Sequence, residues 1–453
     1  MRDDLTDLEE GRACADVKLI AKLRQFYVIA LMLICFSYPI TTVWLIELGA
    51  PVSQVNLVIK AGILFLFLLS LLVVLSHQPR LPRVVLPLLV FLALYGVRLL
   101  YDVMILDILM VFQTRTYVFG YFFGLTLVPV VVIALALRPM DITAIHRWTF
   151  YFLIAANVSL ILYTYLRGPI VAETAFAGRL QEDGVLESTA LLNPILVGAV
   201  GAMLAVFAIG RLATFGRMSV GTQVFHLVCV FMGGINVLLG ASRGPAVALL
   251  ASIVLVFAGS LGKVGRGTRL QPRTWIYVGL FVIGFSTLVA TDVIKLQLIE
   301  RFELMFDPTY KPEGEERQVI YAMAWSDFLS SPFVGSSYVV RQGAYSPHNI
   351  LLEALMATGA FGGMAFIAAM ALMCRGLWKL IRGFAGPLGV SIGLVATCFF
   401  ILSMTSGSIT GNPEFWAYMV AASLLGHFAA RAAVARSPRE GEGACGRAVL
   451  ASG

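Results

Sequence analysis

The chain has 453 residues, of which 59% are hydrophobic and only 13% charged, and its mean hydropathy is +0.87. Soluble domains carry about 25% charged residues, so this composition excludes an ordinary soluble protein and indicates an integral membrane protein. The net charge of +7 does not indicate nucleic-acid binding, because the lysines and arginines fall in short loops between apolar runs.

The apolar runs are about twenty residues long, which suits helices that cross a hydrocarbon core of about 30 Å. The ten-residue alternating segments typical of a membrane β-barrel are absent from the sequence. We therefore expect an all-α polytopic membrane protein with about 12 transmembrane helices. The expected spans are 26–46, 54–75, 84–100, 117–137, 148–166, 189–209, 223–240, 245–262, 274–294, 349–372, 386–404 and 414–432.

The two ends of the chain are expected in the cytoplasm. Residues 1–25 are too long and too acidic for the first part of a signal peptide, and the Gly-rich segment 433–453 is expected to be a disordered tail. Twelve spans put both ends on one side of the membrane. Most of the 33 lysines and arginines fall on that side and the acidic residues are biased to the other, as the positive-inside rule requires of a cytoplasmic side.

Two connections on the outer side are long. One lies near 167–188, within the first nine helices (26–294), and the other is 295–348, before the last three helices (349–432). Long connections in a compact protein are usually functional or disordered. In the second, ERQVIYAMAWSDFL places Tyr321, Ala324, Trp325 and Phe328 on one helical face, which predicts an amphipathic helix near the outer leaflet.

Three arginines on the outer side are candidates for anion binding. Arg179 lies among carboxylates in FAGRLQEDGVLESTALLNPI, where a solvated charge cluster is the alternative. Arg243 opens an apolar helix in GASRGPAVALL, beside free N–H groups that favour phosphate, whereas the alternative is an arginine that reaches the membrane interface. Arg317 in GEERQVIYAMAW can bind an anion or pair with a neighbouring glutamate.

The stretch SPHN places a histidine directly before a span. Pro347 favours an extended conformation at Ser346, and Asn349 is a good helix N-cap. His348 is therefore expected ahead of the first helical turn, where its imidazole can take or give a proton near neutral pH. The alternative is a histidine that merely precedes a capped helix.

The order of these stretches resembles the O-antigen ligase and polymerase superfamily. The similar segments are ASRGPA (241–246), RQVIYAMAWSDFLSSPFVGS (317–336) and HNILLEALMATGAFG (348–362), and GRLQEDGVLESTALLNPI resembles that family's first long periplasmic loop. The resemblance implies a GT-C-like helical fold in the bacterial inner membrane. It also implies a glycan donor on undecaprenyl pyrophosphate, used at the periplasmic face.

The resemblance also implies roles for individual residues. Arg179 and Arg243 match arginines that bind the pyrophosphate, Arg317 matches a basic position in the long loop, and His348 matches the histidine proposed to activate an acceptor hydroxyl. The implied activity is inverting glycan transfer without a metal or other cofactor. The acceptor is lipid A-core or another surface glycan for a ligase, and a second lipid-linked repeat unit for a polymerase, and the sequence leaves both open.

Two other kinds of protein fit part of the pattern. One is a polytopic transporter or flippase of a lipid-linked or polyanionic substrate, since twelve spans are common among transporters, and the other is a non-catalytic assembly subunit. Transporters usually keep ionisable or helix-breaking residues near mid-span. Here the polar residues gather at one rim, and Lys60 is the charged residue expected within a span. No CxxC, HExxH or P-loop motif is present in the sequence.

Overall fold

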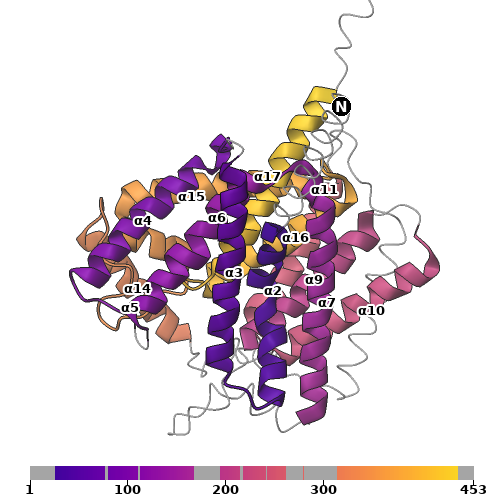
Figure 1. The fold of residues 1–453 in the computed structure, drawn as a ribbon, viewed down its shortest axis with the longest axis horizontal. Helices are drawn as coiled ribbons and strands as arrows, with labels where there is room; N and C mark the ends of the chain where they lie inside the picture. The colour runs from indigo at the N-terminus through magenta and orange to yellow at the C-terminus, as the bar shows by residue number, and fades with distance from the viewer. Residues whose placement is uncertain are drawn as a thin grey trace, which may run out of the picture.

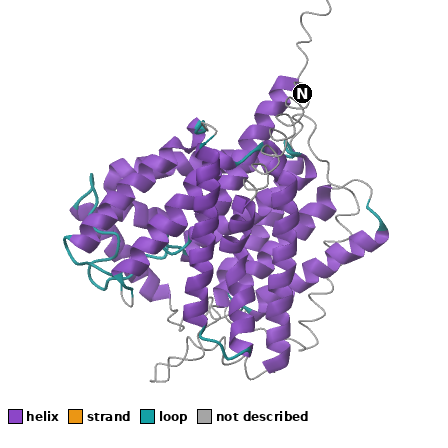
Figure 2. Ribbon diagram, viewed as in Figure 1, coloured by secondary structure: helices purple, strands orange, loops and turns teal. Residues whose placement is uncertain are grey.

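The structure is a computed structural model whose described residues are all helix or loop (Figure 2). They form an all-α assembly, as the composition predicts. The described residues are 26–76, 80–110, 113–167, 194–214, 218–240, 242–261, 279 and 314–436.

Ten helical segments in the described residues are long and apolar enough to cross a membrane. An eleventh apolar helix, α11, begins at Arg243, and the remaining predicted span, 274–294, lies outside the described residues except for residue 279. The all-α polytopic class is thus confirmed. The helices are α2 (Phe26–Glu47), α3 (Val52–Leu75), α4 (Leu86–Met104), α5 (Arg115–Phe119), the π-helix η2 (Gly120–Leu127), α6 (Val128–Ala136), α7 (Ile142–Arg167), α9 (Pro194–Thr214), α10 (Val220–Leu239), α11 (Arg243–Leu261), α14 (Gly314–Ser330), α15 (Ile350–Ile381), α16 (Gly386–Ser406) and α17 (Pro413–Arg436), with short 3₁₀ turns η1 (Arg83–Val85) and η3 (Pro139–Asp141).

The centre of the bundle is formed by α9 and α16, whose spans are the most buried, whereas α3 is the most exposed. Helix α2 packs between α3 and α7, and these three run side by side in Figure 1. Helix α4 lies against α15 on the other side of the molecule, with α14 beside them (Figure 1). The exposed leucines and valines along α3 suit a lipid-facing surface.

Two helix pairs meet through glycines. A side chain on Gly201 of α9 would lie 2.5 Å from the carbonyl oxygen of Gly233 on α10, and the reverse distance is the same. Likewise, a side chain on Gly426 of α17 would collide with the backbone of Gly376 on α15. Membrane helices approach this closely only where residues are small, so both pairs pack backbone against backbone.

Helix α15 is broken at Gly359, which has a φ of 62° and divides it into 350–358 and 360–381. The segment 332–336 lies against the break and supplies hydrogen bonds there. The Ala360 amide donates to the Pro332 carbonyl at 2.7 Å, and the Ser336 amide donates to the Met356 carbonyl at 2.8 Å. Since unpaired backbone groups are costly in a membrane, this segment stabilises the break and fixes the short helix 350–358.

Helix α14 lies in the second long connection and packs on α15. Its packed face consists of Ile320, Met323 and Ala324. Of the face predicted from the sequence pattern, Ala324 is buried against α15, whereas Trp325 is exposed. The location of this helix near the outer leaflet stays a prediction.

Candidate functional site

The C-terminal end of α16 is the point at which the described candidate segments meet. The Arg317 guanidinium on α14 donates from Nη1 to the Thr405 carbonyl at 3.5 Å. Gly244, the residue after Arg243 at the start of α11, lies so close that a side chain there would be 3.3 Å from Thr405 Oγ1. Two predicted arginine positions, 74 residues apart by their numbering, are therefore brought to one helix end.

The start of α15 reaches the same helix end through Asn349. Its side chain accepts hydrogen bonds at 3.0 Å from the amides of Leu351 and Leu352, which makes it the N-cap. Its amide group donates to the Met404 carbonyl at 3.1 Å. One asparagine thus caps α15 and ties it to the end of α16.

The last carbonyls of a helix lack partners within the helix and carry partial negative charge. This explains why the end of α16 attracts donors from Arg317 and Asn349. The sequence at this end, SMTSGS (403–408), holds no charged side chain. Backbone carbonyls rather than side chains organise the cluster.

His348 has a left-handed backbone, with a φ of 52°. Its amide donates to the Ser346 hydroxyl at 3.2 Å. A left-handed conformation is uncommon for a residue other than glycine, and such conformations gather at functional sites. The turn SPHN therefore holds the histidine in a defined place ahead of the α15 N-cap.

Below this turn lies Glu353, whose carboxylate is fully buried. It accepts hydrogen bonds from the Tyr95 hydroxyl of α4 at 2.6 Å, from the Ile409 amide at 3.1 Å and from the Ser346 hydroxyl at 3.5 Å. One carboxylate thus connects α4, the loop after α16 and the histidine turn. Sequence reasoning gave this residue no role, although an acidic residue one turn inside an apolar span is a usable signal.

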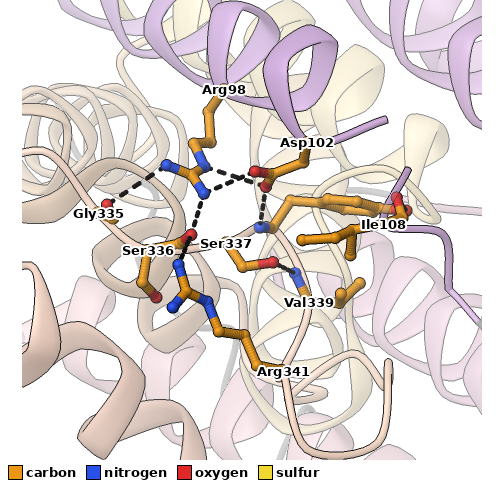
Figure 3. A network of polar contacts seen from close by, with 9 residues as sticks. Arg98, Asp102, Ile108, Gly335, Ser336, Ser337, Val339 and Arg341 are labelled. Carbon is orange, nitrogen blue, oxygen red and sulfur yellow. Dashed lines mark hydrogen bonds and ion pairs between the residues drawn. The ribbon is translucent and has the colours of Figure 1, made fainter. Parts of the chain in front are cut away.

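A second polar cluster holds the loop that leads to the histidine turn (Figure 3). Near the end of α4, Arg98 binds Asp102 through two contacts, Nη2–Oδ1 at 2.6 Å and Nε–Oδ2 at 3.0 Å. The Tyr338 amide donates to Asp102 at 2.8 Å, while Arg98 and Arg341 both donate to the Ser336 carbonyl. We refer to Arg98, Asp102, Ser336, Tyr338 and Arg341 as the loop clamp.

Tyr338 also contacts the connection between α4 and α5. Its hydroxyl accepts from the Met110 amide at 3.0 Å and donates to the Ile108 carbonyl at 3.4 Å. Burial, with the charges of Asp102 and Glu353, raises the pKa of Tyr338 to about 12, so the hydroxyl stays protonated and can donate. The loop clamp therefore joins three separate parts of the chain.

Arg179 and the loop around it, 167–188, fall almost entirely outside the described residues, so the site as described contains Arg243, Arg317 and His348. Within the described parts of the chain, no three His, Cys, Asp or Glu residues gather as a metal site would require. The described site thus consists of arginines, an imidazole, a buried carboxylate and backbone carbonyls.

Comparison with protein families matches residues 227–367 to the family described as O-antigen ligase. The matched segment extends from α10 to the middle of α15 and contains all three described candidates, together with Glu353 and the loop clamp residues after α14. Comparison with curated proteins gives no match. The match over residues 227–367 supports the resemblance of the chain to the O-antigen ligase and polymerase superfamily.

Proposed function

We propose that the protein is a metal-independent inverting glycosyltransferase of the inner membrane. It moves a glycan from undecaprenyl pyrophosphate to an acceptor hydroxyl at the periplasmic face. The observation that carries this proposal is the meeting of the α11, α14 and α15 segments at the end of α16, because it brings Arg243, Arg317 and His348 to one end of the bundle. The family match supports the same general activity.

The arginines have the chemistry that a pyrophosphate leaving group requires. As the glycosidic bond breaks, negative charge grows on the bridging oxygen of the pyrophosphate, and a guanidinium binds such oxygens through two parallel donors. Arg243 is assigned this role together with Arg179, and Arg317 supplies further positive charge from α14. The start of α11 adds amide N–H groups and the positive end of the helix.

His348 is assigned as the general base. The acceptor hydroxyl oxygen attacks the anomeric carbon, its proton passes to the imidazole, and the carbon–oxygen bond to the pyrophosphate breaks with the electron pair on the leaving group. Attack from the side opposite the leaving group inverts the anomeric centre. The left-handed turn at His348 and the Asn349 cap limit where the imidazole can lie, and such limitation is what proton transfer needs.

The proposal is tested by glycan transfer with purified protein in detergent, using a lipid-pyrophosphate-linked glycan donor. His348→Ala and Arg243→Ala are expected to abolish transfer. Arg115→Ala is the matched control, because Arg115 is an exposed arginine that pairs with Asp107 at 2.6 Å outside the candidate site. Full activity in either site variant, at equal abundance, refutes the assigned mechanism.

Transfer in detergent also separates this proposal from a transporter, since detergent solution has no compartments. The choice between ligase and polymerase needs a deletion strain. Single lipid-linked repeat units are expected to accumulate if the protein is a polymerase, and long lipid-linked polymer if it is a ligase. Unchanged lipid-linked glycan would contradict both.

A further inference from the structure

Four basic side chains of α15 and α17 gather at the end of α15 that lies away from the histidine turn. They are Arg375, Lys379, His427 and Arg431. From its break at Gly359, α15 runs 20 residues by their numbering to Lys379, which is about 30 Å at 1.5 Å per residue. The cluster is therefore far from the candidate site, and the expected orientation of the chain places it at the cytoplasmic face.

Close packing of the two helices holds this basic cluster together. The glycine contact between α15 and α17 lies directly beside Arg375 on one helix and His427 on the other. Lys379 follows Arg375 by four residues, and Arg431 follows His427 by four, so each pair lies on one face of its helix. Because the backbones touch at the glycines, the two basic pairs are kept next to each other.

His427 ties Lys379 to this arrangement through both of its ring nitrogens. Nε2 donates to the Leu372 carbonyl of α15 at 3.0 Å, since a carbonyl can only accept. Nδ1 therefore carries the lone pair, and it accepts a hydrogen bond from the Lys379 ammonium at 3.1 Å. This contact orients the ammonium and uses one of its three donors, so two donors remain for a ligand.

The basic cluster has no carboxylate to balance it within the part of the chain that the structure describes. Both arginines act electrostatically on Lys379 and on His427, and the charges that act on these two side chains are all basic. From the last turns of α15 to the end of α17, the sequence has one acidic residue, Glu414, at the opposite end of α17. Like charges on neighbouring turns destabilise helices, so an anion from outside the bundle would stabilise this one.

The cluster can be reached from the membrane surface. Arg375 and Arg431 are exposed, and Lys379 is partly exposed. At the same end of α15, Trp378 is 38% exposed and Phe384 is 39% exposed. Aromatic side chains of membrane helices gather at the depth of the lipid headgroups. Exposed guanidinium groups beside such aromatics suit the headgroup of an anionic phospholipid.

We propose that Arg375, Lys379 and Arg431 bind the headgroup phosphate of an anionic phospholipid in the cytoplasmic leaflet. The guanidinium groups and the ammonium that His427 orients share the phosphate oxygens. A zwitterionic lipid binds more weakly, because the cluster repels its positive choline. Basic residues are common at cytoplasmic helix ends, but here the glycine contact and His427 hold them together as one site. This site is independent of the proposed glycan transfer.

The test measures lipid binding to the purified full-length chain. The protein is mixed with equal amounts of phosphatidylglycerol and phosphatidylcholine in a neutral detergent, and bound lipid is counted by native mass spectrometry. The wild type is expected to retain phosphatidylglycerol preferentially. Arg375→Gln and Arg431→Gln are each expected to weaken this binding about fivefold, as the loss of one basic residue near a membrane surface predicts.

Arg147→Gln is the matched control for the loss of one charge. Arg147 is an exposed arginine of α7 that lies over the Trp148 ring at 5.7 Å, outside the basic cluster. This variant is expected to retain phosphatidylglycerol like the wild type. Equal weakening by Arg147→Gln overturns the proposal, because general surface charge would then explain the binding.

Thermal unfolding distinguishes a lipid site from a structural role of the arginines. In neutral detergent without lipid, Arg375→Gln and Arg431→Gln relieve repulsion, so their unfolding midpoints are expected to be no lower than that of the wild type. Phosphatidylglycerol is expected to raise the midpoint of the wild type more than that of either variant. Lower midpoints of both variants without lipid overturn the proposal, since the arginines would then have partners within the protein.

Two further outcomes also overturn the proposal. One is equal retention of phosphatidylglycerol by the wild type, Arg375→Gln and Arg431→Gln. The other is retention that appears only when Glu440→Gln and Glu442→Gln are combined, because carboxylates of the C-terminal segment would then be the anions that occupy the cluster.

Discussion

Replacing Gly359 by alanine is expected to destabilise the protein more than the same change at Gly49. Both glycines have a positive φ, of 62° and 64°. At Gly49 the change to alanine costs about 1–2 kcal/mol for that conformation, whereas Gly359, with a ψ of −161°, lies in a region essentially restricted to glycine, where the cost is about 1–3 kcal/mol. A side chain at Gly49 meets nothing within 4 Å, whereas at Gly359 it meets the backbone of Phe333 and comes within 2.5 Å of the Val334 amide. Overpacking against backbone adds about 1–3 kcal/mol. The expected loss of folding free energy is therefore about 1–2 kcal/mol at Gly49 and about 2–6 kcal/mol at Gly359.

The buried cysteines provide the assay. Cys35, Cys229 and Cys398 are free and buried, so a thiol-reactive dye labels them when the protein unfolds in detergent. Serine replaces Cys14, Cys374 and Cys445 in all proteins compared, so that only the three buried thiols report unfolding. The unfolding midpoint is expected to fall from wild type to Gly49→Ala and further to Gly359→Ala.

Glycan transfer should separate the two variants as well. The segment 332–336 fixes the short helix 350–358, which begins directly after the histidine turn, so Gly359→Ala is expected to impair transfer while Gly49→Ala does not. If the two variants have equal unfolding midpoints and Gly359→Ala transfers glycan like the wild type, then the packing of segment 332–336 against the break in α15 does not stabilise the site.

The remaining predictions concern the polar contacts of the site. Glu353→Ala leaves buried donors without an acceptor, so it is expected to lower the free energy of unfolding by about 2–6 kcal/mol. Glu353→Gln is expected to restore part of this stability, and the same dye measures both variants. Asp102→Asn weakens the loop clamp and is expected to lower the free energy of unfolding by at most about 3–5 kcal/mol, because solvent that reaches Arg98 reduces the loss. An unchanged unfolding midpoint would contradict this. Asn349→Asp loses the hydrogen bond to Met404 but keeps the acceptor that caps α15, so it is expected to be more stable than Asn349→Ala by about 0.5–2 kcal/mol. Equal unfolding midpoints for these two variants would show that the cap does not stabilise the protein.

The spans were predictable because a helix that crosses a membrane needs a long run of apolar residues. Eleven of the expected segments have an apolar helix in the structure. Boundaries were less predictable. The expected span 349–372 covers only part of α15, which continues to Ile381. Its last turns carry Arg375 and Lys379, which a search for apolar residues assigns to a loop even though the backbone remains helical.

The site was only partly predictable for a related reason. Arg243, Arg317 and His348 each follow a local pattern, and their neighbours meet at α16 as a convergent site requires. The meeting point itself consists of the backbone carbonyls of Met404 and Thr405. Every residue has such a carbonyl, so the sequence does not show which ones will accept hydrogen bonds.

The break in α15 at Gly359 could not be predicted from the sequence for a different reason. An apolar stretch such as ALMATGAFGG has the composition of a continuous span. Nothing local to it reveals that a segment more than twenty residues upstream supplies the partners for its backbone.

The glycine contacts between α9 and α10, and between α15 and α17, limit how the bundle can open. Helices whose backbones touch cannot slide or separate gradually, since any displacement loses the contact along the whole crossing. Each pair is therefore expected to move as one body. A long-chain polyprenyl tail would have to pass between helices that meet through longer, adaptable side chains, and the weakly covered α3 borders such a surface.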